Sequence, residues 1–170
     1  QGLYLDVRFW GATLFQVGAG LTFFNDVVKV QLSYGQFTQM QRDAISNLFQ
    51  TDLTDGRYGG NVFSLKILAN IASIPFSFFM GHDWDWLYAS FAVGADFSYF
   101  TQTNSGKPQI LSSILAQIEF PKVKLQNVKA FSTFALYTEA SLWFIPTDVS
   151  GTDIKSLVPQ LGIGFRTNIF

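Results

Sequence analysis

The chain has no cysteine, a single histidine and few charged residues, and these shortages exclude some kinds of site and some classes of protein. Without cysteine there is neither a disulfide scaffold nor a thiolate metal site. Charged residues make up 14% of the chain, whereas soluble globular domains carry roughly 25%. The net charge is −1 and the eleven basic residues are scattered, so no nucleic-acid-binding surface is predicted. The simplest organisation of 170 residues is one domain over residues 1–170.

The sequence also lacks any uninterrupted run of about 18 apolar residues, so it predicts no transmembrane helix. Apolar residues nevertheless make up 48% of the chain, and phenylalanine alone occurs 19 times. This combination is expected when apolar residues occupy every second position of β-strands. No basic segment followed by an apolar one opens the chain, so for an exported protein we expect Gln1 at or near a processed N-terminus.

The clearest strand is Leu87–Phe100, with the sequence LYASFAVGADFSYF. Its odd positions are all apolar, and its even positions are mostly small or polar, with Asp96 among them. Period-two alternation of this kind is typical of a β-strand whose two faces meet different surroundings. In a soluble sheet the apolar face packs in the core. In a transmembrane barrel it meets lipid, and the polar face fills the lumen.

The same alternation predicts seven further strands, and an even number suits closure into an antiparallel barrel. The first two share one phase, and we divide them by a three-residue hairpin loop at Trp10–Ala12 because strands rarely exceed about ten residues. The predicted strands are Gly2–Trp10, Thr13–Phe24, Val28–Gly35, Val62–Ala72, Leu87–Phe100, Ile110–Phe120, Val128–Phe144 and Ser156–Phe170.

Turn signals agree with this division. Asn25-Asp26 is typical of a two-residue hairpin turn, and the apolar phase changes across it from odd to even numbers, as such a turn requires. In the fourth strand the phase slips near Ser73 and Pro75 follows, which predicts a bulge or an edge-like end.

The connections fall into a short and a long class that alternate along the chain. The 38–60 segment does not alternate in polarity, and a short helix is predicted within it at Met40–Gln50. Short turns at one rim and long loops at the other are typical of outer-membrane barrels, with the short rim and both termini periplasmic. The short connections are Asn25-Asp26, Gly81–Trp86 and Pro121–Asn127, the long ones are Thr38–Gly60, Thr101–Gln109 and Pro146–Lys155, and Trp10–Ala12 is a short exception.

An interior polar face would collect four acidic and five basic side chains. A closed interior requires such a near balance, because an unpaired buried charge costs several kcal/mol. The alternative is a soluble barrel whose charges are solvated on its outer face. We favour the filled lumen because the other face is dense in large apolar residues without the small ones that taper a packed soluble interior. The predicted network is Asp6, Arg8, Lys29, Lys66, Asp96, Glu119, Lys129, Glu139 and Arg166.

Few residues suggest chemistry. His82, with Asp83 and Asp85 beside it, could bind a cation or act as a base, but a lone histidine in a turn is far more often solvated. Asp96 and Glu139 could work as paired carboxylates, although their balance with basic residues favours a salt-bridge network. The nucleophile-elbow, zinc-protease, phosphate-loop and dinucleotide-binding motifs are missing, so we expect no catalytic, cofactor or metal site.

In length, in alternation and in its aromatic last residue, Phe170, the chain resembles the small eight-stranded outer-membrane barrels of Gram-negative-type bacteria, the OmpA/OmpX/OmpW-like group. The resemblance covers the whole chain and rests on pattern, with no specific motif. It departs at the C-terminus, where Phe170 is out of phase with Phe165 and the apolar positions before it. It implies an all-β, eight-stranded, antiparallel up-and-down transmembrane β-barrel in a bacterial outer membrane.

Three non-enzymatic roles are compatible with these predictions. The first is a structural or surface-interaction protein with a side-chain-filled lumen, which would meet an extracellular or host ligand through residues 40–60. The second, suggested by the OmpW-like members, is a conduit for small hydrophobic molecules with an apolar upper lumen lined by Trp10, Phe100 and Trp143. The third is a soluble lipocalin-like carrier with the Phe-rich face inside. The first two imply outer-membrane lipid as a partner, and we expect a monomer without a cofactor.

Overall fold

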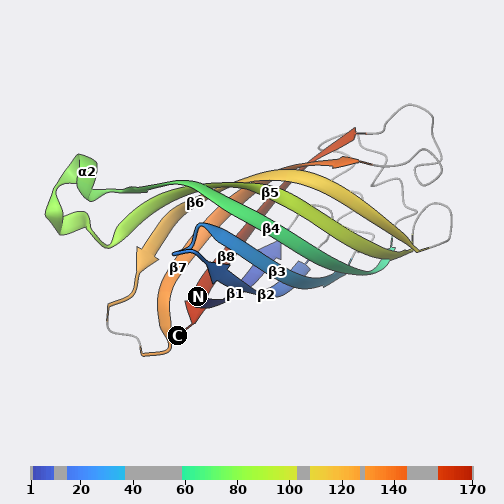
Figure 1. The fold of residues 1–170 in the computed structure, drawn as a ribbon, viewed down its shortest axis with the longest axis horizontal. Helices are drawn as coiled ribbons and strands as arrows, with labels where there is room; N and C mark the ends of the chain where they lie inside the picture. Colours follow the sequence, from blue (N-terminus) through green and yellow to red (C-terminus); the bar gives the residue numbers. More distant parts are fainter. Residues whose placement is uncertain are drawn as a thin grey trace.

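The structure is a computed structural model that describes residues 2–9, 15–36, 59–102, 108–126, 129–144 and 157–169. Its eight antiparallel strands follow one another around a closed barrel, and β1 pairs with β8 to complete the ring (Figure 1). The predicted all-β, eight-stranded up-and-down barrel is confirmed. The strands are β1 (Gly2–Phe9), β2 (Phe15–Phe23), β3 (Val28–Gln36), β4 (Gly59–Pro75), β5 (Leu87–Gln102), β6 (Gln109–Lys124), β7 (Phe131–Phe144) and β8 (Leu157–Ile169).

The register around the barrel is staggered by ten residues. Following the paired residue from Leu5 across each next strand leads to Leu157 at the start of β8. Leu5 itself pairs with Thr167, ten residues further along β8. With a rise of about 3.3 Å per residue and eight strands about 4.8 Å apart, this stagger tilts the strands by about 40° from the barrel axis. A barrel of this size has room inside for little more than side chains.

The chain termini lie at the same end of the barrel as the β2–β3, β4–β5 and β6–β7 connections (Figure 1). The β2–β3 connection contains the predicted turn at Asn25-Asp26. These two residues have φ of 56° and 68°, and a backbone hydrogen bond of 3.3 Å closes the turn. Positive φ at both central residues is what a type I′ hairpin turn requires. The predicted turn and its phase change are therefore confirmed.

The predicted division between the first two strands is also confirmed. β1 ends at Phe9 and β2 begins at its cross-strand partner, Phe15. The loop predicted at Trp10–Ala12 lies outside the described residues, and so does the Trp10 side chain predicted to line a hydrophobic passage. An odd number of residues between Phe9 and Phe15 keeps both strands in the odd phase.

The connection predicted at Pro121–Asn127 lies later in the chain, because β6 continues to Lys124 and pairs with β7 through this region, and β7 begins only at Phe131. A register shift between Glu119 and Lys122 accommodates Pro121, which has no N–H to give to a ladder. Proline at this position therefore marks an irregularity inside the strand, where the sequence suggested its end.

The β4–β5 hairpin projects beyond the rest of that end (Figure 1). β3 begins opposite Ala69, whereas β4 passes a register shift at Asn70–Ala72, close to the predicted slip, and continues to Pro75. Residues 76–86, which we call the hairpin head, join β4 to β5. The head contains a short helix, α2 (Ser77–Met80), and a 3-10 turn, η2 (His82–Trp84). The helix predicted at Met40–Gln50 lies outside the described residues.

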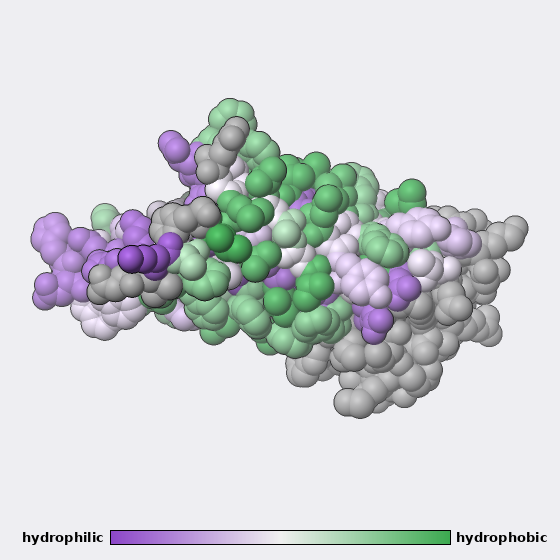
Figure 2. All heavy atoms as spheres, turned by 90° about the horizontal axis from the view of Figure 1, so that it is seen from below, coloured by the Kyte–Doolittle hydropathy of each residue, from purple (hydrophilic) through white to green (hydrophobic). Residues whose placement is uncertain are grey.

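The inner face of the barrel is mostly polar and the outer face is mostly apolar, which is the reverse of the arrangement in a soluble protein. Among the described residues, eighteen buried side chains are polar or charged and eleven are apolar. The outer wall carries large apolar side chains from every strand, with Leu32 66% exposed and Ile114 52% exposed. They gather around the middle of the molecule on the face seen in Figure 2. No helix in the described part of the chain is long and apolar enough to cross a bilayer.

Substitutions at Asp26 test the β2–β3 turn. Glycine adopts the observed φ of 68° without strain, whereas a β-branched residue does not. We expect Asp26→Val to lower the free energy of unfolding by about 1–3 kcal/mol, and Asp26→Gly to leave it unchanged or raise it. Urea titration of both variants and the parent in one solvent measures the difference. Equal stability of the two variants would show that the turn has another conformation.

Candidate functional site

Among the described residues, the fully buried charged side chains of the lumen include equal numbers of acids and bases. Eight of the nine predicted side chains are there, each 3% exposed or less, and they comprise four carboxylates and four cations. Lys129 is the exception, because it is exposed in the bend before β7. A register shift between Phe131 and Thr133 breaks the alternation there, so counting back along β7 predicted the wrong face for Lys129. Removing Lys129 from the set makes the buried charges balance.

Arg166 on β8 is the centre of one cluster. Its Nη2 lies 2.9 Å from Asp6 Oδ2 and its Nη1 lies 2.6 Å from Glu119 Oε1. Lys29 Nζ is 3.1 Å from the same Glu119 oxygen, and Lys122 reaches the other oxygen at 3.5 Å. Carboxylates from β1 and β6 therefore meet cations from β3, β6 and β8, so the cluster ties strands that are not neighbours.

Two tyrosine rings pack against the same guanidinium. The Arg166 Cζ lies 5.0 Å from the Tyr4 ring centroid and 4.9 Å from that of Tyr137, within the range of cation–π attraction. Each ring lies over a glycine on the neighbouring strand, Tyr4 over Gly20 and Tyr137 over Gly164. A Cβ at Gly164 would lie 2.5 Å from the Tyr137 ring. Glycine at these two positions therefore leaves the space that the rings occupy.

Glu139 on β7 is the centre of a second cluster. Its two oxygens lie 2.7 Å from Arg8 Nη1 and 2.8 Å from Lys66 Nζ. Gln117 Nε2 donates to Glu139 Oε2 at 2.6 Å, and the Gln117 carbonyl accepts from Arg166 Nη2 at 3.3 Å. Gln117 therefore joins the two clusters, and the network spans the lumen.

Uncharged side chains continue the network toward the end of the barrel away from the termini. Gln16 Nε2 donates to Ser64 Oγ at 2.8 Å, Ser64 and Ser98 share a hydrogen bond of 2.7 Å, and Ser98 Oγ donates to Asp96 Oδ1 at 2.7 Å. The second oxygen of Asp96 has no hydrogen-bond partner among the described residues. Asp96 therefore ends this polar chain beside the Glu139 cluster, because Lys66 of that cluster is its cross-strand partner on β4.

Aromatic and aliphatic side chains fill the lumen beyond this chain. Phe100 and Trp143, two of the three residues predicted to line a hydrophobic passage, pack edge to face with ring centroids 5.9 Å apart. They are 0% and 2% exposed, and Val62 and Leu111 are also buried. Trp143 Nε1 donates to Ser141 Oγ at 3.2 Å. The two rings therefore pack directly against each other inside the lumen.

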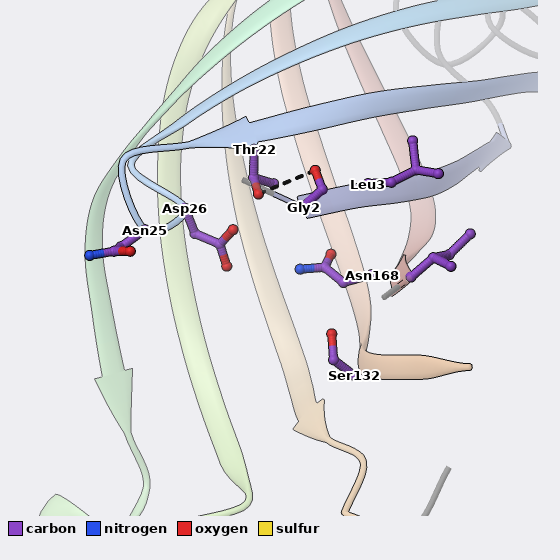
Figure 3. Close-up of a pocket in the computed structure, with 8 residues that line it drawn as sticks. Gly2, Leu3, Thr22, Asn25, Asp26, Ser132 and Asn168 are labelled. Atoms are coloured by element: carbon purple, nitrogen blue, oxygen red, sulfur yellow. Dashed lines mark hydrogen bonds between the residues drawn. The ribbon is translucent and has the colours of Figure 1, made fainter. Parts of the chain in front are cut away.

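A hollow of about 580 Å³ lies at the opposite rim, among residues from the ends of β1, β2, β7 and β8 and from the β2–β3 turn. Figure 3 shows Asp26 and Asn168 on its walls, with Thr22 donating to the Gly2 carbonyl at 3.4 Å. The hollow is open, its polar groups come mostly from amides and hydroxyls, and a nucleophile with a base beside it is not among its described residues. We assign no chemistry to it.

The remaining predicted positions also show no reactive arrangement. His82, Asp83 and Asp85 are exposed in the hairpin head. Within the described residues no group of three or more His, Asp or Glu side chains could hold a metal ion. Glu139 is held by two cations, and Asp96 accepts a hydrogen bond from Ser98, so each carboxylate has structural partners of its own.

Several residues of the network were not predicted as members of it. Alternation placed Tyr4, Gln16, Gln117 and Tyr137 on the polar face, but nothing in the sequence showed which inward side chains would meet. The glycines opposite the two tyrosines were a usable signal, although reading it requires the cross-strand register. Comparison with models of known families, with curated proteins and with solved structures finds no match.

Substitution of Glu139 tests the ion-pair network. Glu139→Gln leaves Arg8 and Lys66 without their carboxylate in a buried site, so we expect a loss of about 3–5 kcal/mol in the free energy of unfolding. Adding Lys66→Met to the first change should recover part of that loss. The control is Lys129→Gln, which removes an exposed lysine outside the network and should change stability by about 0.5 kcal/mol or less. Equal losses for Glu139→Gln and Lys129→Gln would contradict a buried network.

Proposed function

We propose that the protein is an integral outer-membrane β-barrel whose lumen is filled and which acts through its anchorage and its exposed segments, without catalysis. The observation that carries this proposal is the inverted polarity of the barrel. Large apolar side chains surround the whole outer wall, whereas the largest apolar patch on a typical soluble monomer covers about 300–600 Å². Lipid would remove the cost of exposing such a belt to water.

The backbone supports the same proposal. A structure that crosses a bilayer must satisfy its own N–H and C=O groups, because the hydrocarbon offers no partners. The ring of eight strands has no free edge along the belt, since β1 pairs with both β2 and β8. An even number of antiparallel strands with both termini at one end is the arrangement of bacterial outer-membrane barrels, and it favours a periplasmic position for that end.

The packing of the lumen favours a structural or surface-interaction role over the other two candidates. A hydrophobic conduit needs space between Phe100 and Trp143, which instead pack against each other. A lipocalin-like carrier needs Phe91, Phe97 and Phe134 inside, and these side chains are on the outer wall. The segment proposed to meet an extracellular ligand, residues 40–60, lies mostly outside the described residues, and its ligand class stays open.

Extraction behaviour tests the proposal directly. We expect the protein to require detergent for extraction, because its belt is apolar all round. An unboiled sample should migrate differently from a boiled one in SDS gels, since the closed barrel would resist unfolding until it is heated. A protein that remains soluble and monomeric in buffer without detergent would exclude the membrane barrel.

Placing a charge on the belt is an independent test. Leu32 lies on β3 in the middle of the apolar belt and is 66% exposed on the outer face. If that face meets lipid, Leu32→Arg should cost about 2–4 kcal/mol in reconstituted protein, whereas an exposed position in water should change stability by only about 0.5 kcal/mol. Gln36→Arg, at the end of the same strand, is the matched control and should cost little. Equal effects at both positions would contradict burial of the belt in lipid.

A further inference from the structure

The hairpin head, residues 76–86, carries apolar side chains that no described part of the chain covers. Phe78, Phe79 and Met80 are 80%, 69% and 58% exposed, and none of the residues of α2 is buried. The two phenylalanine rings touch each other edge to face at 5.2 Å. These three consecutive large apolar side chains form an exposed surface at the tip of the projection. Exposed apolar surfaces of this kind mark sites of contact with a membrane or with another protein.

This surface is continuous with the outer belt of the barrel. Beyond the level where β3 begins, β4 still presents Ile71 and Ile74, both strongly exposed. The Phe76 ring at the start of the head stacks on Phe120 of β6 at 5.4 Å. Phe120 is 48% exposed on the belt, so an apolar contact joins the barrel wall to the start of the head.

The other residues around the head have the chemistry of a membrane–water interface. Trp84 and Trp86 stack at 5.6 Å, and Tyr88 follows at the base of β5. Lys124 Nζ lies 4.5 Å from the centroid of the Tyr88 ring. Tryptophan and tyrosine are enriched where headgroups meet hydrocarbon, and lysine there can reach a lipid phosphate.

The second half of the head is polar, which makes the head amphipathic. His82, Asp83 and Asp85 are exposed in and after η2, directly after the apolar run of α2. On the face seen in Figure 2 the projecting end of the molecule is hydrophilic. One side of the head therefore suits water and the other suits an apolar environment.

We propose that the hairpin head is a lateral anchor that lays Phe78, Phe79 and Met80 into the boundary between phospholipid headgroups and acyl chains, beside the end of the barrel that holds the termini. The inference rests on the proposed membrane location. Its occupant is the phospholipid surface, because the apolar side of the head continues the belt and aromatic and basic residues stand at its base. The polar side then faces water, and the anchor limits how the barrel can tilt.

Site-directed spin labelling of the full-length protein in phosphatidylethanolamine–phosphatidylglycerol vesicles tests this anchor. The chain has no cysteine, so each introduced cysteine is a unique labelling position. The three single variants are Phe79→Cys in the apolar half of the head, Asp83→Cys in its polar half and Phe97→Cys on the belt. Collision with oxygen reports exposure to lipid, and collision with a water-soluble nickel complex reports exposure to water.

We expect the label at position 79 to collide with the nickel complex several-fold less than the label at position 83, and to resemble the label at position 97. If position 97 is shielded from nickel but position 79 is as accessible as position 83, the anchor is wrong while the membrane barrel stands. Spin–spin broadening at position 79 that disappears on dilution with unlabelled protein would show that a second copy covers the head, which also overturns the anchor. Nickel access at position 97 would overturn the membrane barrel itself, and the anchor with it.

Discussion

The barrel depends on the contacts of Arg166 at the seam where the first and last strands meet. Arg166 pairs across the seam with Asp6 in the β1–β8 ladder, and its guanidinium also reaches Glu119 of β6. The Tyr137 hydroxyl donates to the other oxygen of Asp6 at 2.8 Å, which brings in β7. One cation therefore links strands from both ends of the chain. Closing this seam is the step that leaves the ring without an edge.

Because its charges depend on one another, the interior is stable only when the whole network has formed. Each buried charge is tolerable only when its partners are present, because removing one partner leaves the other desolvated and unpaired. Glu139 requires both Arg8 and Lys66, and Gln117 couples that cluster to Arg166. Partners for the whole set come together only when the ring is closed. The polar interior thus specifies the register and the closure of the barrel, while apolar contacts of the wall are non-directional and specify neither.

Alternation predicted the strands well because a period of two is a property of a single strand. It gave the inward face of Asp6, Lys66, Glu119 and the others without any knowledge of their partners. It failed where the backbone is irregular: at Lys129, beyond the shift in β7, and at Pro121, inside a bulge of β6. The contacts of the network were not predictable, since they depend on a ten-residue stagger that emerges only when eight registers are combined. The face that a side chain occupies follows from its own strand, whereas its contact partner depends on the registers of all eight strands.

The same network supports the proposal that the interior carries out no catalysis. A catalytic carboxylate or base must be free to exchange a proton with a substrate, but the carboxylates of Glu119 and Glu139 are each held by two or more cations. Phe100 and Trp143 fill the lumen on one side of the network. Under the proposed function, the surfaces that meet other molecules lie outside the lumen, on the belt and at the two ends. At the end with the termini, the hairpin head is the described element with the most apolar surface still to be covered.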